Sequence, residues 1–455
     1  MKQSLLFLAV FSFAINVHSQ TGICNMPFPR HTKYATSTIL PHADKKLMSD
    51  STMSFFNQWQ RAYIKYKNYG NESCAYVFSK DTAKEKDENK DQDYDCVSEA
   101  LGYGMIIVVQ MSDSSNSKAN QVLFNQLFRF YKRHPSIRDK EGITGTEQSI
   151  LMGYGIHVTK EGNDVYETAA ASDGDIDIAY SLLLADAQWS STDTINYLKE
   201  AGALIKTIYA QDINKHTRLI LTSNENEDDN HIKTAIKQKY YDIRTSDFIP
   251  SELKAFNTVL KDGCFGSVVD SSYKYFFAVQ SLGDKHTGLV PDFVQHIGDT
   301  IQGKGYRIII PPKDYEKEKN AGKYFYNACR VPWRIATDYI VSGDIRAKNF
   351  VEPINNWIRS ICKDDPNNIN AGYTLDGKEI LKDKERDTRM MSFVSPFAVS
   401  SMVDQKNQPW LDKLWDSIVK LPLTNVEGLK YGYFENTIKM LDMIILSGNY
   451  WSVSK

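Results

Sequence analysis

Three aspartates, Asp173, Asp175 and Asp177, lie close together at the start of a long apolar segment. An acidic side chain in the first turn of a helix is stabilised by unpaired backbone N–H groups and by the positive end of the helix dipole, so a single Asp there is explained by capping. Three acids in so short a stretch exceed what capping requires. Carboxyl groups can donate and accept protons in catalysis, and the cluster is therefore a candidate site.

A second candidate is Glu99, which stands shortly before the apolar run 106–109. We expect Ser98 to cap a helix here, which places Glu99 in the first turn. Gly102 and Gly104 follow one turn later, where the missing side chains allow another backbone or a ligand to approach closely. An acid near a helix N-terminus is also a routine structural feature, and the spacing alone leaves both interpretations open.

A third segment, residues 324–334, interleaves aromatic rings with Arg330 and Arg334 around a helix that Pro332 starts. Rings and cations together can stack bases and hold phosphates, but a net charge of −2 gives the chain no field that attracts nucleic acid. Sugar rings also pack on aromatic planes, and 12% of the residues are aromatic. Core packing explains most of these rings. The pattern favours a polysaccharide partner over a nucleic acid.

Helical spacing dominates the segments that must position these residues, whereas sustained alternating strands are hard to find. We expect about a dozen helices. The polar segments 80–95 and 224–230 are loop-sized, so no domain boundary is expected after residue 25. A toroid of helix pairs and an α-solenoid both satisfy this pattern. The clearest helical windows are residues 55–66, 123–131, 195–205, 270–281, 331–341, 351–361, 409–421 and 435–447.

The N-terminus has one positive charge at Lys2, an apolar run from Leu5 to Ile15, and small or tolerated residues up to Ser19. This order is typical of a secretory signal peptide, and the run is too short to span a bilayer. We therefore predict a signal peptide at residues 1–19, an N-terminal extension at 20–44 and a single domain at 45–455. The mature protein is expected to be secreted or periplasmic, without a membrane partner.

The six cysteines are scattered, with no C-x-x-C motif and no paired His spacing, so we predict neither a metal site nor a cofactor. Export permits disulfides. A chain of this length does not need them, however, and free buried thiols account for the cysteines equally well. The six are Cys24, Cys74, Cys96, Cys264, Cys329 and Cys362.

Together the three candidate segments resemble glycoside hydrolase family 8. The stretch from Ala171 to Trp189 is similar to the signature of that family, and Ser98 to Met105 is similar to its acid-bearing segment, with Ala100 in place of a usual Gly. Segments 245–250, 287–292 and 446–451 also resemble family segments, in the family order. The resemblance covers residues 45 to 453.

The resemblance implies an all-α fold, an (α/α)6 barrel in which six outer helices surround six inner ones, with a substrate cleft at one end. It implies an endo-acting enzyme that cleaves a β-1,4-linked polysaccharide with inversion, using an acid and a base about 6.5–9.5 Å apart. Glu99 is then the general acid, and Asp173 binds the sugar of the central subsite and influences the pKa of Glu99. The remaining residues that the resemblance assigns to substrate binding are Tyr103, Tyr326, Asn327 and Arg330.

The general base does not follow the commonest pattern of the family. Many relatives have an Asp where this chain has Asn327, and an amide cannot accept a proton from water at neutral pH. Another branch, which includes chitosanases and mixed-linkage glucanases, also has Asn there and takes its base from an upstream Glu. By this resemblance Glu316 is the candidate base and Glu318 the alternative, although each is also a typical solvated acid in a Lys-rich loop.

The same branch ranks β-1,4-glucan, mixed-linkage glucan and chitosan ahead of xylan as substrates, and we expect a monomer. Two other classes of function stay open. Helical toroids also include polysaccharide lyases, which abstract a proton beside a uronate, but the nine His residues form no motif with Tyr. A secreted glycan-binding protein without activity would also account for the aromatic residues and for the changes at Ala100 and Asn327.

Overall fold

The computed structural model describes residues 22–80, 94–140, 143–191, 194–224, 242–297, 307–313, 315, 318–381, 384–423 and 432–453. Within these residues, twelve α-helices alternate along the chain between an outer and an inner kind. The outer helices are amphipathic, with one buried face. They are α1 (Lys45–Tyr63), α3 (Ser117–Arg133), α5 (Tyr197–Gln211), α8 (Cys264–Gln280), α10 (Ile345–Cys362) and α12 (Gln408–Val419).

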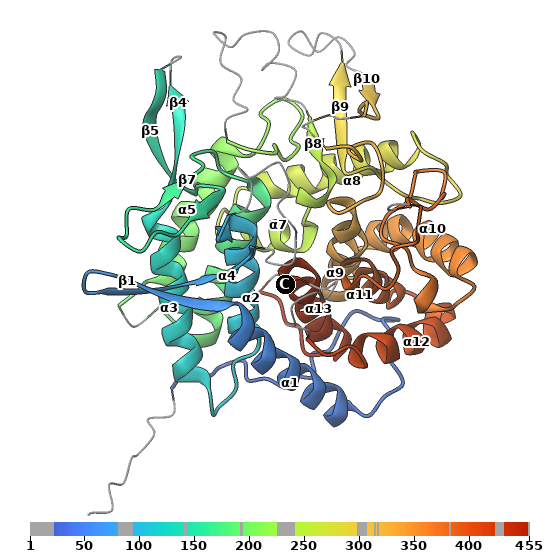
Figure 1. The fold of residues 1–455 in the computed structure, drawn as a ribbon, viewed down its shortest axis with the longest axis horizontal. Helices are drawn as coiled ribbons and strands as arrows, with labels where there is room; N and C mark the ends of the chain where they lie inside the picture. The colour runs from blue at the N-terminus through green and yellow to red at the C-terminus, as the bar shows by residue number, and fades with distance from the viewer. Residues whose placement is uncertain are drawn as a thin grey trace, which may run out of the picture.

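The inner helices are buried on nearly every side, as expected of helices that other helices surround. Each contacts the next in chain order, and the last contacts the first, so the inner ring closes. Figure 1 looks down this ring and shows the outer helices at its periphery. The inner helices are α2 (Ser98–Gln110), α4 (Ser172–Trp189), α7 (Pro250–Phe256), α9 (Val331–Ser342), α11 (Met391–Ser401) and α13 (Tyr433–Leu446).

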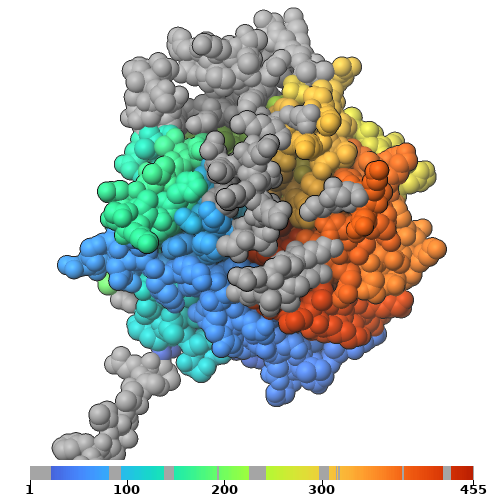
Figure 2. Space-filling model, in the orientation of Figure 1, coloured from blue at the N-terminus to red at the C-terminus, as the bar shows by residue number. Residues whose placement is uncertain are grey.

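Closure of the ring confirms the predicted (α/α)6 barrel and excludes the α-solenoid, in which the first and last inner helices would not meet. Each outer helix packs against an inner neighbour, and α1 packs against α13. In Figure 2 the segments coloured blue to green lie mainly on the left of this face, and those coloured yellow to red lie on the right. Neighbours around the barrel are therefore also neighbours along the chain.

The chain before α1 crosses the end of the barrel at which the inner helices finish. Backbone carbonyls in the last turn of a helix have no partner within the helix, so they need donors from elsewhere. Residues 22–44, most of the predicted extension, supply backbone N–H groups to the ends of five inner helices. The bonds run from Asn25 to Gln188 (3.1 Å), Phe28 to Ser112 (2.8 Å), Thr32 to Gly448 (2.8 Å), Ala35 to Ile340 (2.9 Å) and Ile39 to Met402 (2.9 Å).

Short antiparallel strands connect the helices, and the sequence analysis missed them in part because half of them have only two or three residues, too few to show alternation. They form the sheets β1–β2, β3–β6–β7, β4–β5 and β8–β9–β10. Their bounds are β1 (Ile64–Tyr69), β2 (Glu72–Val77), β3 (Cys96–Val97), β4 (Pro135–Lys140), β5 (Ile143–Met152), β6 (Gly155–His157), β7 (Val165–Tyr166), β8 (Ile243–Arg244), β9 (Phe293–Ile297) and β10 (Arg307–Ile309).

The helical window predicted at residues 55–66 is too long. Helix α1 ends at Tyr63, and the chain continues directly as β1, where Tyr66 is largely exposed. A hairpin competes with the helix here because Gly70 adopts a left-handed φ of 61° and lets the chain turn into β2. The helical spacing of Tyr66 with Tyr63 is therefore coincidental.

All six cysteines lie within the described residues and are present as free thiols, four of them buried. In the part of the chain that the structure describes, no helix combines the length and the apolar character that crossing a membrane requires.

Candidate active site

The predicted catalytic residues meet where three inner helices begin. Glu99 and Asp173 are each the second residue of their helix, α2 and α4, and Arg330 immediately precedes α9. Helix N-termini carry partial positive charge and unpaired N–H groups, which stabilise carboxylates. The N–H of Gly174 donates to Oδ1 of Asp173 at 2.9 Å in this way.

Ser98 does not cap α2 as predicted. Val97 occupies the cap position with extended backbone, because strand β3 runs directly into the helix, and the Ser98 side chain is buried. A side chain on Gly174 would place its Cβ only 2.5 Å from Oγ of Ser98. Likewise, a Cβ on Gly102 would lie 2.6 Å from Cβ of Asp177. The two glycines therefore allow α2 and α4 to pack closely, which brings Glu99 and Asp173 together.

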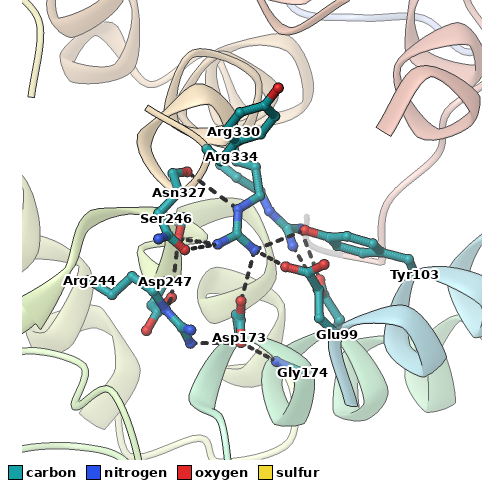
Figure 3. Close-up of polar contacts among 12 residues, drawn as sticks. Glu99, Tyr103, Asp173, Gly174, Arg244, Ser246, Asp247, Asn327, Arg330 and Arg334 are labelled. Atoms are coloured by element: carbon teal, nitrogen blue, oxygen red, sulfur yellow. Dashed lines mark hydrogen bonds and ion pairs between the residues drawn. The ribbon is translucent and has the colours of Figure 1, made fainter. Parts of the chain in front are cut away.

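Arg330 binds both predicted carboxylates (Figure 3). One guanidinium nitrogen, Nη1, donates to Oε2 of Glu99 and, at 2.9 Å, to Oδ2 of Asp173. The other, Nη2, donates to Oγ of Ser246 at 2.7 Å and to Oδ1 of Asn327 at 2.9 Å. Nη1 also reaches the Tyr103 hydroxyl at 3.3 Å. Both terminal nitrogens of the Arg330 guanidinium therefore donate within the site.

A second arginine, which the sequence analysis did not select, holds the other oxygen of Asp173. Arg244 donates from Nη2 to Oδ1 of Asp173 at 2.9 Å and from Nε to Oδ1 of Asp247 at 2.7 Å. It ends β8, and Asp247 follows in a 3-10 turn, Thr245–Asp247. The segment 245–250 was noticed only as a family-like stretch. Its role was hidden because Arg244 pairs with Asp173 across 71 positions of the sequence.

The two carboxyl groups are pushed in opposite directions. Burial raises the pKa of Glu99 more than the charge of Arg330 lowers it, and the charge of Asp173 raises it further. Burial would also raise the pKa of Asp173, but the charges of Arg244 and Arg330 together outweigh this effect and lower it to about 2. At neutral pH Asp173 is therefore ionised, and Glu99 keeps its proton to a higher pH than an ordinary Glu.

Of the other predicted residues, Asn327 and Tyr103 contact Arg330. Tyr326 is half-buried and packs edge-on against Phe393, at 5.2 Å between ring centroids, and near Phe434 at 6.1 Å. The guanidinium of Arg330 lies 5.9 Å from the centre of the Phe434 ring, so Phe434 connects Tyr326 with the site.

The two candidate bases lie on the segment before these residues. Glu316 is outside the described residues. Glu318 is exposed, and its charge is one of the influences that raise the pKa of Asp292 to about 7, after burial as the main cause. Asp292 accepts backbone N–H bonds from Phe325 at 2.9 Å and Ala328 at 2.7 Å. Glu318 thus lies near the turn that carries Asn327.

Tyr154 is an aromatic residue beside the acid that the sequence analysis missed. Its carbonyl accepts the N–H of Ser98 at 2.8 Å, which puts it next to the start of α2. Its ring packs edge-on against Tyr94 and remains 36% exposed. An exposed ring at this position suits stacking against a sugar. Its signal in the sequence, one Tyr between two glycines, is indistinguishable from a turn.

The described residues contain no cluster of three or more His, Cys, Asp or Glu side chains that is arranged to hold a metal ion. The polar groups that converge here are instead three carboxyls, two guanidiniums, two hydroxyls and an amide, with the barrel positioning each of them. This set can hold a proton on Glu99 and a negative charge on Asp173.

Comparison with known proteins identifies similar chains. The model of the family described as glycosyl hydrolases family 8 matches residues 26–448. A β-glucanase of Niallia circulans is 34% identical over 450 residues, covering 98% of this chain and 95% of that protein. An endoglucanase of Bacillus sp. strain KSM-330 is 31% identical over 428 residues, covering 93% and 81% respectively.

A solved structure of a similar chain also has a similar fold. The apo structure of a β-1,3-1,4-glucanase from Paenibacillus sp. X4 superposes with a TM-score of 0.78 at 33% identity. The match covers 94% of this chain and 99% of the other.

The close contact of α2 with α4 can be tested with Gly174→Ala. The added methyl group must displace Ser98, including its backbone, so we expect the free energy of unfolding to fall by about 1–3 kcal/mol. Gly202→Ala on the outer helix α5 is the matched control. Its Cβ would meet nothing closer than 3.6 Å, and this variant should be neutral or more stable by up to about 1 kcal/mol. Equal stability of the two variants in denaturant titrations would contradict the proposed packing.

Proposed function

Because the chain belongs to glycosyl hydrolases family 8, we propose that it hydrolyses mixed-linkage β-1,3-1,4-glucan as an inverting, endo-acting enzyme with Glu99 as the general acid. Family membership makes the chain a glycoside hydrolase, as the sequence analysis predicted, and favours neither a lyase nor an inactive binding protein. The choice of glucan is supported by the relatives, which are named β-glucanase, endoglucanase and β-1,3-1,4-glucanase.

The observation that carries the proposal is the pairing, through Arg330, of a Glu99 whose pKa burial raises with an Asp173 whose pKa two arginines lower. A general acid must hold its proton until the glycosidic oxygen needs it, and burial of Glu99 provides this condition. The Glu99 side chain is nevertheless 13% exposed, against 2% for Asp173. Glu99 is therefore the more accessible of the two acids to a substrate, while Asp173 is held by two arginines.

An inverting mechanism also needs a base that activates water on the opposite face of the sugar. Asn327 does not serve, because its amide oxygen accepts from Arg330 and cannot take a proton. We assign the base to Glu316, with Glu318 as the alternative. The support for this region is the nearness of Glu318 to the Asp292 carboxyl, which holds the turn of Asn327.

Export belongs to the same proposal. The order of charge, apolar run and small residues in 1–19 supports a signal peptide, and a polysaccharide substrate too large to enter a cell requires an enzyme outside it. We propose that the mature enzyme acts as a secreted or periplasmic monomer.

The substrate is tested with purified protein on lichenan, carboxymethyl cellulose, chitosan and xylan. We expect reducing sugar to be released fastest from lichenan, with a rapid fall in viscosity because the cuts are internal. Preference for chitosan or xylan would overturn the choice of glucan. Release from none of the four would instead support the non-catalytic alternative.

Glu99→Gln should fold normally and lose activity on lichenan by 10²-fold or more, because the amide keeps the shape of the side chain but has no proton to give to the leaving oxygen, on the order expected for general acid catalysis. Glu200→Gln is the control, since Glu200 is also in the first turn of a helix, the outer helix α5, and should stay fully active. Activity of Glu99→Gln within a few-fold of the parent would remove Glu99 from the mechanism.

Glu316→Gln should also inactivate, and added azide should restore part of the activity, because the small anion can attack from the side that the water used. Glu318→Gln should change activity little. Proton NMR early in the hydrolysis of a β-linked oligosaccharide should detect the α anomer first. If the β anomer forms first, the mechanism is retaining. If Glu318→Gln is inactive and Glu316→Gln is active, Glu318 is the base.

A further inference from the structure

The three inner helices that meet at the site each carry a second polar or charged residue one turn deeper. Side chains four positions apart lie on the same face of a helix, so the six residues form two layers along the barrel. We call them the upper and the lower layer. The upper layer consists of Glu99, Asp173 and Arg330, and the lower layer consists of Tyr103, Asp177 and Arg334.

The lower layer is built around a second arginine–aspartate pair. Arg334 donates from Nη1 to Oδ1 of Asp177 at 2.9 Å and from Nη2 to Oδ2 at 2.6 Å, a two-pronged contact between fully buried groups. Arg334 also reaches Oε1 of Glu252 on α7 at 3.4 Å. The pair therefore connects α4, α9 and α7 at the centre of the barrel.

Burial raises the pKa of Asp177, an effect that Arg334 opposes, and raises the pKa of Glu252 well above its usual range. The fork of Arg334 faces Asp177, with only one longer contact to Glu252. The two-pronged contact therefore favours the negative charge on Asp177 over Glu252.

The two layers are in contact through Tyr103. The guanidinium of Arg334 lies 5.2 Å from the centre of the Tyr103 ring, and the Tyr103 hydroxyl accepts from Arg330. Close packing of α2 at Gly102 against Cβ of Asp177 fixes the height at which Glu99 faces Asp173. A change in the lower layer therefore alters the positions of Glu99 and Asp173, the two carboxyl groups that Arg330 binds.

Stability alone does not explain a buried ion pair, because removing two charges from water costs about as much as their attraction returns. We infer that Asp177 and Arg334 are positioning residues for catalysis, whose ion pair holds Tyr103 and the start of α4 so that Arg330 and Glu99 keep their arrangement. This inference rests on the proposed role of Glu99 as the acid. It assigns a function to two residues that do not contact the substrate.

A consequence for pH follows from the charges with the largest effect on Glu99, which are Arg330, Asp173, Arg244 and Asp177. Tyr103, Tyr154 and Tyr433 also face it, and burial raises the pKa of each. Asp177 is one of the charges that raise the pKa of Glu99. Removing this negative charge lowers that pKa, so Glu99 loses its proton at a lower pH. The alkaline limb of the kcat profile should then move to lower pH.

Two variants test the inference. Asp177→Asn keeps the shape and removes the charge, and the neutral double variant Asp177→Leu with Arg334→Met removes the pair while leaving no charge unpaired. The double variant should retain or regain stability. In both variants kcat should fall about tenfold, because Arg330 and Glu99 are displaced from their catalytic arrangement. KM should stay within about twofold of the parent, because the contacts that bind the substrate are unchanged. In Asp177→Asn the alkaline limb should lie at lower pH, whereas the double variant also removes the opposing charge of Arg334 and tests the loss of kcat alone.

Asp338→Asn is the matched control. Asp338 is a fully buried aspartate on the same helix α9, paired with Lys254 at 2.6 Å and with the Tyr273 hydroxyl at 2.6 Å, but outside both layers. Its variant should lose stability without moving the pH profile. If Asp177→Asn behaves like Asp338→Asn, or if the double variant recovers both stability and the parental kcat, the pair is structural only.

These outcomes are distinct from a failure of the proposed function. An active Glu99→Gln variant would remove the acid and with it the basis of the inference. An inactive Glu99→Gln variant, together with layer variants that match the parent, would overturn the inference alone.

Discussion

One guanidinium, that of Arg330, lies between two carboxyl groups that come from different helices, and the arrangement of the site depends on it. Without its charge Glu99 and Asp173 would repel each other in a buried position, and both pKa values would rise. With it, and with Arg244 on the other oxygen of Asp173, the pKa of Asp173 is lowered to about 2, while burial keeps the pKa of Glu99 raised. The positions of Arg330 and Arg244 therefore determine which of the two carboxyl groups has the lowered pKa.

The barrel makes this contact possible by burying all its inner helices in parallel, with their N-termini at one end. Unpaired N–H groups accumulate at that end, and unpaired carbonyls accumulate at the other. Residues 22–44 donate backbone N–H groups to carbonyls at that second end, so the N-terminal segment supplies hydrogen bonds that the inner helices cannot make for themselves. The end with free N–H groups and positive partial charge is left for carboxylates.

Helical spacing predicted the helices and placed Glu99 and Asp173 at helix starts, because spacing and acids in a first turn are local signals. The closed barrel followed from the family resemblance alone, since the spacing also fits an α-solenoid. It did not predict Arg244, Ser246 or the hydroxyl contact of Tyr103, since these depend on pairs far apart in the chain, such as Arg330 with Glu99 across 231 positions. Ser98 was misjudged as a cap because a strand of two residues leaves no pattern. The base segment was predicted only by resemblance, and Glu316 is outside the described residues.

Asn327 can be understood from the same charges. Its Oδ1 accepts from Nη2 of Arg330 at 2.9 Å, so a carboxylate in its place would form an ion pair with the same guanidinium. That pair would lower the pKa of the carboxylate and make it a weaker base, and it would compete with Glu99 and Asp173 for the charge of Arg330. An amide keeps the hydrogen bond without this competition. The chain can then take its base from another segment, and the charge of Arg330 stays shared between Glu99 and Asp173 alone among the carboxyl groups of the site.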